Sequence, residues 1–268
     1  RLPDEGLKRM TRVISALAIL AIVVGTVWWL PDWATFVLAE IVVLFALIEY
    51  AELAGRAGMP VPTEIVIASG LAICAAVALD YAISLVLMAA TVAVGAAAAG
   101  QAQGRSSGGW AYAAGLFGPL YVGLPIGTLV ALNATRGSEA LLLLLIVIVA
   151  SDTAQFYGGR ILGRRPLAAI TSPKKTVEGA VSGVIAGAVA MVMVGGWGGV
   201  VLPSLLAGAF GAALAGLGIV GDLFESRLKR EAGVKDVSGL IPGHGGILDR
   251  LDSWLFAIPL FDVVLQGM

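Results

Sequence analysis

The sequence predicts an all-α fold, a polytopic integral membrane helix bundle with about nine transmembrane helices. Hydrophobic residues make up 59% of the chain and charged residues only 13%. Soluble domains are close to a quarter charged, and so few polar side chains could not cover a globule in water. The composition therefore argues against a soluble enzyme, a disordered chain and a nucleic-acid-binding protein. The single cysteine, Cys74, excludes an intramolecular disulfide and a cysteine-based metal site.

Each predicted span is an apolar run that approaches the roughly 20 residues needed to cross the hydrocarbon core of a membrane. In chain order the runs are Val13–Leu30, Trp33–Ile48, Glu64–Leu79, Tyr81–Ala99, Trp110–Leu132, Glu139–Tyr157, Gly179–Val194, Val200–Val220 and Ser253–Leu265. Pro119 and Pro125 fall in the fifth run, where we expect them to kink the helix or divide it. Residues 1–135 then hold about five spans, and residues 136–268 hold the others.

The orientation of the spans follows from lysine and arginine, which favour the cytoplasmic side of a membrane. If the amino terminus is cytoplasmic and the chain alternates through nine spans, every basic residue except Arg136 falls on that side. An error in the number of spans would place many basic residues on the other side. The observed separation therefore supports both the number of spans and their orientation. The carboxyl terminus is then predicted to lie outside. We expect the first run to be a retained helix, because no small-x-small cleavage site precedes Pro31.

Two predicted cytoplasmic segments, residues 151–179 and 221–253, hold more than half of the basic residues. Asp152 and Asp222 lie at the cytoplasmic ends of apolar spans, where a carboxylate is costly and usually functional. Asp249 and Asp252 are spaced i, i+3, which places both on one face of a helix. Mg²⁺ is typically held by one or two carboxylates together with substrate phosphates. Basic residues alternate with these acids, namely Lys229, Arg230, Lys235 and Arg250. The pattern indicates a site for a metal ion and a polyphosphate, although a salt-bridged loop would show the same alternation.

Two shorter motifs lie in the same segments. Residues 243–246 form a predicted turn whose backbone amides could approach a phosphate closely. This turn contains His244, the only histidine, and a lone histidine is more often structural than catalytic. Residues 172–178 combine a turn, Lys174, Lys175 and a helix start with an acid in its first turn. By itself this second motif could be no more than an anchor at the lipid headgroups.

The stretch from Ser226 to Asp252 resembles the signature of the phosphatidate cytidylyltransferases, also called CDP-diacylglycerol synthases. The residues that satisfy the signature are Ser226, Leu228, Lys229, Arg230, Lys235, Asp236, Ser238, Ile241, Pro242, His244, Gly245, Gly246, Ile247, Asp249, Arg250, Leu251 and Asp252. The runs 151–160 and 172–179 are also similar to the family, although Gln155-Phe156-Tyr157 stands where relatives commonly have an aromatic pair after an alanine. The resemblance covers roughly the last half of the chain at the level of motifs.

This resemblance implies a polytopic membrane enzyme with nine spans in its bacterial form, in agreement with the number above. It implies transfer of CMP from CTP to phosphatidic acid, giving CDP-diacylglycerol and pyrophosphate for phospholipid biosynthesis. The enzyme would lie in the cell (inner or plasma) membrane with its active site at the cytoplasmic face, and the resemblance also suggests a homodimer. Residues 136–268 would be the catalytic part, with cytoplasmic loops at 158–178 and 222–252.

The resemblance also suggests roles for individual residues. Mg²⁺, or a two-ion cluster with a second cation, would be bound by Asp222, Asp249 and Asp252. The catalytic set would be Asp222, Lys229, Asp249 and Arg250. The residues expected to bind CTP or the lipid are Asp152, Lys174, Lys175, Ser226, Arg230, Lys235, Asp236, His244, Gly245 and Gly246.

Two alternatives stay open at the level of sequence. One is a related cytidylyltransferase that uses a different lipid acceptor, such as an ether lipid. The other is a secondary transporter, with Asp152, Glu40 and Asp222 as ionisable groups in a coupling path. The clustering of charge on one face, rather than near the membrane midplane, argues against a transporter. Glu40, the one acid near the middle of a span, is better interpreted as a hydrogen-bonded carboxylic acid.

Overall fold

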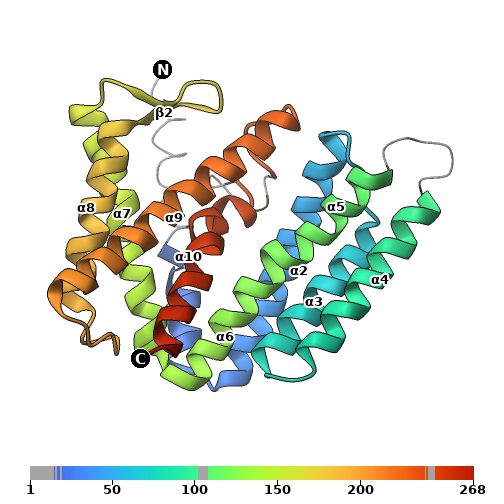
Figure 1. Ribbon diagram of the computed structural model, residues 1–268, viewed down its shortest axis with the longest axis horizontal. Helices are drawn as coiled ribbons and strands as arrows, with labels where there is room; N and C mark the ends of the chain where they lie inside the picture. Colours follow the sequence, from blue (N-terminus) through green and yellow to red (C-terminus); the bar gives the residue numbers. More distant parts are fainter. Residues whose placement is uncertain (1–14, 16, 19, 102–107, 239, 241–244) are drawn as a thin grey trace. The chain divides into compact units, whose positions relative to one another are not determined.

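The computed structural model describes residues 15, 17–18, 20–101, 108–238, 240 and 245–268, and these residues are nearly all helical. They divide into two compact units, Arg1–Ala131 with Leu228–Leu251, and Leu132–Arg227 with Asp252–Met268. Three helices cross from one unit to the other along the chain: α6 (Leu124–Arg136), α9 (Ser204–Glu231) and α10 (Leu248–Gln266). Each unit is described in turn below (Figure 1).

The first unit is built on helices from the amino-terminal half. Its elements are α2 (Asp32–Arg56), α3 (Thr63–Ala78), α4 (Ile83–Gln101), α5 (Gly108–Gly118) and η1 (Pro119–Gly123). Helix α3 packs against α2, α4 and η1, and α4 packs against α5. The Tyr50 hydroxyl donates a hydrogen bond to the carbonyl of Ala114 at 2.7 Å, which ties α2 to α5. This packing holds the carboxyl-terminal end of α2 in a fixed environment.

The two prolines of the fifth predicted span do not divide it. Residues Gly109–Arg136 form one apolar helical run, in which Pro119–Gly123 is a π-helical turn. A proline lacks the backbone N–H that the α-helical ladder requires, so the hydrogen-bond pattern shifts at that point. A Cβ on Gly123 would lie only 2.5 Å from the carbonyl oxygen of Gly70, so α3 approaches this turn closely. The disturbance occurs at the predicted place, and the helix continues beyond it.

The second unit contains α7 (Ser138–Leu162), α8 (Val177–Val194) and most of α9 and α10. Helices α7 and α8 pack through glycines, because a Cβ on Gly179 would lie 3.0 Å from the Cα of Gly159. A Cβ on Gly183 would lie 3.0 Å from the carbonyl oxygen of Ser151. Small residues at a helix interface let the two backbones approach closely. The packing brings the segment around Ser151 and Asp152 beside α8.

A short hairpin joins α7 to α8, in a segment where the sequence predicted only a loop. Strand β1 (Pro166–Ala168) pairs antiparallel with β2 (Ser172–Thr176), at the end of α7 and α8 in Figure 1. The all-α prediction omitted this hairpin, because strands of three and five residues carry almost no periodic signal. Glu178 accepts hydrogen bonds from the backbone N–H groups of Arg164 and Arg165 at 3.0 and 3.2 Å, which holds the hairpin against α8.

Six helical runs in the described part of the chain are long and apolar enough to cross a membrane: Asp32–Arg56, Ile83–Gly100, Gly109–Arg136, Ser138–Leu162, Val177–Val194 and Ser204–Glu231. Helix α3, with 16 residues, and the helical residues Leu20–Trp29 are shorter. Helix α10 has 19 residues but carries four charged side chains, Asp249, Arg250, Asp252 and Asp262. The chain is therefore an integral membrane protein of helical architecture, whereas the number of nine spans stays a prediction.

Candidate active site

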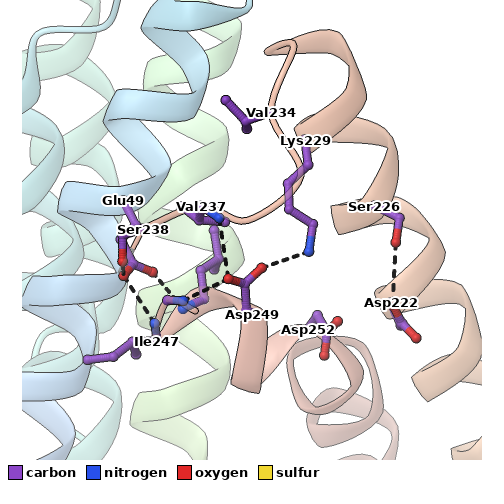
Figure 2. Close-up of polar contacts among 12 residues, drawn as sticks. Glu49, Asp222, Ser226, Lys229, Val234, Val237, Ser238, Ile247, Asp249 and Asp252 are labelled. Carbon is purple, nitrogen blue, oxygen red and sulfur yellow. Dashed lines mark hydrogen bonds and ion pairs between the residues drawn. The ribbon is translucent and has the colours of Figure 1, made fainter. Parts of the chain in front are cut away.

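In the first unit, the signature segment is organised around the carboxylate of Asp249 at the start of α10. Lys229 Nζ, from the end of α9, donates to Asp249 Oδ1 at 2.7 Å (Figure 2). The other oxygen, Oδ2, accepts the backbone N–H groups of Gly246 at 2.7 Å and Val237 at 3.3 Å. The Asp249 side chain is only 5% exposed. Asp249 thus links three parts of the signature segment that are separate in sequence.

A second carboxylate in this unit, Glu49 of α2, was not predicted as a site residue. Its Oε1 accepts the Ser238 hydroxyl at 2.5 Å and the N–H of Ile247 at 3.1 Å, and its Oε2 accepts the N–H of Leu248 at 2.8 Å. The residue is 4% exposed. The first N–H groups of a helix have no partner inside the helix and favour a negative charge. Glu49 satisfies two of these groups at the start of α10 (Figure 2).

The sequence offered one weak signal for Glu49. The second predicted span ends at Ile48, so Glu49 is expected to be the first solvated residue after that span. In the structure α2 continues to Arg56, and Glu49 is buried one turn before the exposed Glu52. Its partners lie 189 to 199 residues away along the chain, a separation that helical periodicity does not encode.

The other signature residues of this unit lie nearer to solvent. Lys235, Asp236 and Arg250 are exposed. Arg230 is exposed too, and its guanidinium donates to the carbonyl of Val234 at 3.1 Å. Gly245 has a φ of 86°, a conformation that favours glycine. Gly246 is buried, and a Cβ there would lie 2.5 Å from Glu49 Oε2. His244, Pro242 and Ile241 lie outside the described residues.

The second unit contains three further predicted aspartates and a lysine. Lys175 of β2 forms an ion pair with Asp222 of α9. Asp222 Oδ1 also lies 3.5 Å from the hydroxyl of Ser226, one helical turn further on. The carboxylates of Asp252 and Asp222 repel the carboxylate of Asp152, and the ammonium group of Lys175 attracts it. This part of the structure therefore brings together Asp152, Lys175, Asp222 and Asp252, whereas Lys174 is exposed on the hairpin.

Close helix packing positions two of these aspartates. Gly221 directly precedes Asp222, and a Cβ on Gly221 would collide with the carbonyl oxygen of Asp252. Helices α9 and α10 therefore touch backbone to backbone at this point. Asp252 is half-buried, and its Oδ1 accepts the N–H of Ser253 at 2.7 Å. Only a glycine at position 221 permits this approach.

The donor chemistry of the second unit suits a divalent cation. Carboxylate oxygens are the ligands that Mg²⁺ prefers, and Asp152, Asp222 and Asp252 interact electrostatically. Over the residues that the structure describes, no three His, Cys, Asp or Glu side chains already stand in metal-binding geometry. A cation here would have to draw the carboxylates together and compete with Lys175 for Asp222. The residues fit a metal ion by donor type, and the three carboxylates are close enough to interact electrostatically.

Comparison with known proteins agrees with the signature. A phosphatidate cytidylyltransferase of Helicobacter pylori (strain J99) is 45% identical over 148 residues, which cover 54% of this chain and 54% of that protein. The corresponding protein of Staphylococcus saprophyticus is 37% identical over 131 residues, 49% of this chain and 50% of its own length. A chloroplastic phosphatidate cytidylyltransferase of Arabidopsis thaliana is 45% identical over 125 residues, 46% of this chain and 30% of its own.

These similarities are confined to a part of each protein, and the chain spans about half the length of the bacterial relatives it matches. The family comparison extends further. The model of the Cytidylyltransferase family matches residues 10–268, which is nearly the whole sequence. The chain therefore belongs to the Cytidylyltransferase family.

Proposed function

We propose that this protein transfers the CMP group of CTP to phosphatidic acid, giving CDP-diacylglycerol and pyrophosphate. The observation that carries the proposal is the unbroken polar signature from Ser226 to Asp252, in which Lys229 bonds Asp249 at 2.7 Å. Relatives that are 45% identical to about half of the chain are named phosphatidate cytidylyltransferases. Helices that can cross a membrane fit an enzyme whose acceptor is a lipid.

In the proposed reaction, an oxygen of the lipid phosphate attacks the α-phosphorus of CTP in line. A new P–O bond forms, the bond between the α-phosphorus and its bridging oxygen breaks, and pyrophosphate leaves. The second pKa of a phosphate monoester is about 6, so the nucleophile is largely ionised near neutral pH. A general base is therefore dispensable, and the protein's task is to align two polyanions that repel one another.

The basic side chains of the signature suit this task. Arg230, Lys235 and Arg250 are exposed, so they could bind phosphate oxygens of CTP or of the lipid. Lys175 lies against Asp222, and Lys174 is exposed on the neighbouring hairpin strand, where a lipid phosphate or pyrophosphate could bind. Lys229 would act mainly through Asp249, to which it is bonded.

Mg²⁺ is the cofactor that the donor set suits best, held by Asp222 and Asp252 with Asp152 nearby. The ion would neutralise charge on the triphosphate as pyrophosphate departs. Asp249 is the third predicted ligand, and its two oxygens already accept three hydrogen bonds. It would have to give up part of this network to bind the ion directly. A two-ion cluster would need it to do so.

Pyrophosphate release by the purified protein in detergent tests the proposed function. The complete reaction contains CTP, phosphatidic acid and Mg²⁺, and the controls replace CTP with ATP, omit the lipid or add EDTA. Release that requires all three components is the expected result. Release with a diether phosphate lipid but not with phosphatidic acid would assign a different acceptor. Absence of release with either lipid, from protein shown to be folded, would overturn the proposal.

We further propose nine spans, a cytoplasmic amino terminus and active site, and an external carboxyl terminus. The one-sided distribution of lysine and arginine supports this topology. Single cysteines on either side of α8 test it, in a background in which Cys74 is replaced by serine. Lys174→Cys lies on the exposed hairpin, and Gly196→Cys has open space for its side chain. A membrane-impermeant thiol reagent applied outside cells should label only Gly196→Cys, and the reverse result would invert the topology.

We also propose that the protein forms a homodimer, on the basis of its resemblance to the family. Light scattering coupled to size-exclusion chromatography gives the protein mass after subtraction of the detergent. A mass near twice 27.3 kDa is expected, and a mass of one chain would remove the dimer from the proposal.

A further inference from the structure

We infer that Glu49 of α2 is a positioning residue for the signature segment, an inference that rests on the proposed function for its catalytic consequence. Glu49 is 4% exposed and accepts three hydrogen bonds, from the Ser238 hydroxyl and from the N–H groups of Ile247 and Leu248. All three donors belong to the signature segment. The carboxylate comes from the amino-terminal half of the chain, which the motif resemblance does not reach.

The bonds of Glu49 fall on both sides of residues 239–245. Ser238 precedes this stretch, and Ile247 and Leu248 follow it, with Oε1 shared between the first two donors. Asp249 repeats the arrangement one residue earlier in sequence on each side, because it accepts the N–H groups of Val237 and Gly246. Two carboxylates thus hold the residues on either side of that stretch, Val237 and Ser238 before it and Gly246, Ile247 and Leu248 after it (Figure 2). The position of these flanking residues depends on α2 as well as on α10.

The site requires a charged acceptor of this length. An amide in place of the carboxylate would keep one acceptor oxygen and turn an NH₂ group toward N–H donors, so at least one bond would be lost. The negative charge also stabilises the amino-terminal end of α10. The space is closely fitted, since a Cβ on Gly246 would lie 2.5 to 2.7 Å from the carboxyl group of Glu49. A shorter aspartate would keep the charge but would not reach all three donors.

The consequence for catalysis follows from alignment. Groups that must stabilise a transition state lose about a hundredfold in rate when they are misplaced by about 1 Å. Loosening Gly246, Ile247 and Leu248 should therefore lower kcat for pyrophosphate release more than it raises KM for CTP. A residue that only supports global stability would lower the amount of folded enzyme and leave the kcat of the folded fraction unchanged.

The test compares Glu49→Gln and Glu49→Asp with Glu52→Gln, a control on the same helix whose side chain is exposed and paired with Arg56. Pyrophosphate release gives kcat and KM, and hydrogen exchange reports the backbone N–H groups of residues 245–250. For Glu49→Gln we expect a kcat lower by about 10- to 100-fold, a KM for CTP within about threefold of wild type, and faster exchange at residues 245–250 but not in α3. Glu49→Asp should recover part of both losses, and Glu52→Gln should match wild type.

Each outcome decides the inference. Wild-type kcat and unchanged exchange in Glu49→Gln would overturn it. Faster exchange throughout the first unit, with normal kcat per folded molecule, would also overturn it, since Glu49 would then be a structural residue only. If the wild-type chain releases no pyrophosphate, the proposed function fails. Faster exchange confined to residues 245–250 would in that case still support the positioning role.

Discussion

Lys229 Nζ lies 2.7 Å from Asp249 Oδ1, in an ion pair whose side chains are 13% and 5% exposed. The pair joins the end of α9 to the start of α10 across 20 residues of sequence. Asp249 uses its other oxygen for two backbone N–H groups, so the charge of Lys229 is balanced by a carboxylate that is itself held in place. Removing either partner leaves a poorly solvated charge, which is strongly destabilising in buried pairs.

We therefore predict strong coupling between these two residues. Lys229→Met and Asp249→Asn should each lower the free energy of unfolding, and the double variant should lose less than the sum of the two single losses. The coupling free energy should be about 1–3 kcal/mol, the range for residues in direct contact. Thermal unfolding in detergent of the wild type, the two single variants and the double variant gives the complete cycle. Additive losses would show that the two charges act independently.

The aspartates of the second unit should differ from Asp249 in their response to Mg²⁺. Asp252→Asn removes one charged oxygen ligand from the group formed with Asp152 and Asp222. The Mg²⁺ concentration that gives half-maximal pyrophosphate release should rise about tenfold, the lower end for loss of a group that supports a metal site. Asp249→Asn should lower kcat without such a shift, because Asp249 bonds Lys229 and the backbone.

Asp262→Asn is the control for this comparison. Asp262 lies on the same helix, is paired with Gln266, and should leave the Mg²⁺ response unchanged. If instead Asp249→Asn produced the larger shift, Asp249 would be a direct metal ligand and its hydrogen-bond network would have to open when the ion binds.

The sequence predicted the helical membrane fold correctly because apolar run length is a local property. It also selected Asp152, Asp222 and Asp252, which interact in the second unit, because a carboxylate at the end of an apolar helix is conspicuous. The sequence could not show which side chains these carboxylates contact. Asp249 and Asp252 share helix α10, as the i, i+3 spacing indicated, but Asp249 pairs with Lys229 and Asp252 interacts with Asp152.

Glu49 shows most clearly what cannot be predicted from neighbouring residues in the sequence. Glu49 and Glu52 lie one turn apart on α2, yet Glu49 is buried against the signature segment and Glu52 is exposed beside Arg56. The difference arises from tertiary packing that brings Glu49 to Ser238, Ile247 and Leu248. The hairpin at Pro166–Thr176 was missed for a related reason, because its strands are stabilised by each other and by Glu178 rather than by a periodic apolar face.

The proposed chemistry makes a specific prediction about pH. Below a pH of about 6 the dianion of the lipid phosphate takes up one proton and becomes a weaker nucleophile, so the rate should fall as the pH decreases through that value. His244→Gln should retain the same acidic limb, since the titrating group belongs to the substrate. The measurement is kcat/KM for phosphatidic acid from pH 5 to 8, for both proteins. Loss or displacement of the acidic limb in His244→Gln would instead identify His244 as a proton acceptor.

The close approach of α9 and α10 gives a prediction about packing that does not depend on the reaction. In Gly221→Ala the added methyl group would collide with the carbonyl oxygen of Asp252, so the two helices must separate. Overpacking of this kind costs about 1–3 kcal/mol, and a displaced Asp252 should also weaken the Mg²⁺ response. Gly216→Ala, on the same helix and with open space at its Cβ, is the matched control. It should be neutral or more stable by about 0.5–1 kcal/mol, because alanine favours a helix over glycine.

Thermal unfolding in one detergent, with the two variants purified in parallel, measures the difference between the two glycines. A lower Tm for Gly221→Ala together with an equal or higher Tm for Gly216→Ala is expected. Equal Tm values for both variants would mean that α9 and α10 do not meet at Gly221. The carbonyl of Asp252 would then not limit the side chain at position 221, and the positioning of Asp222 would need another cause.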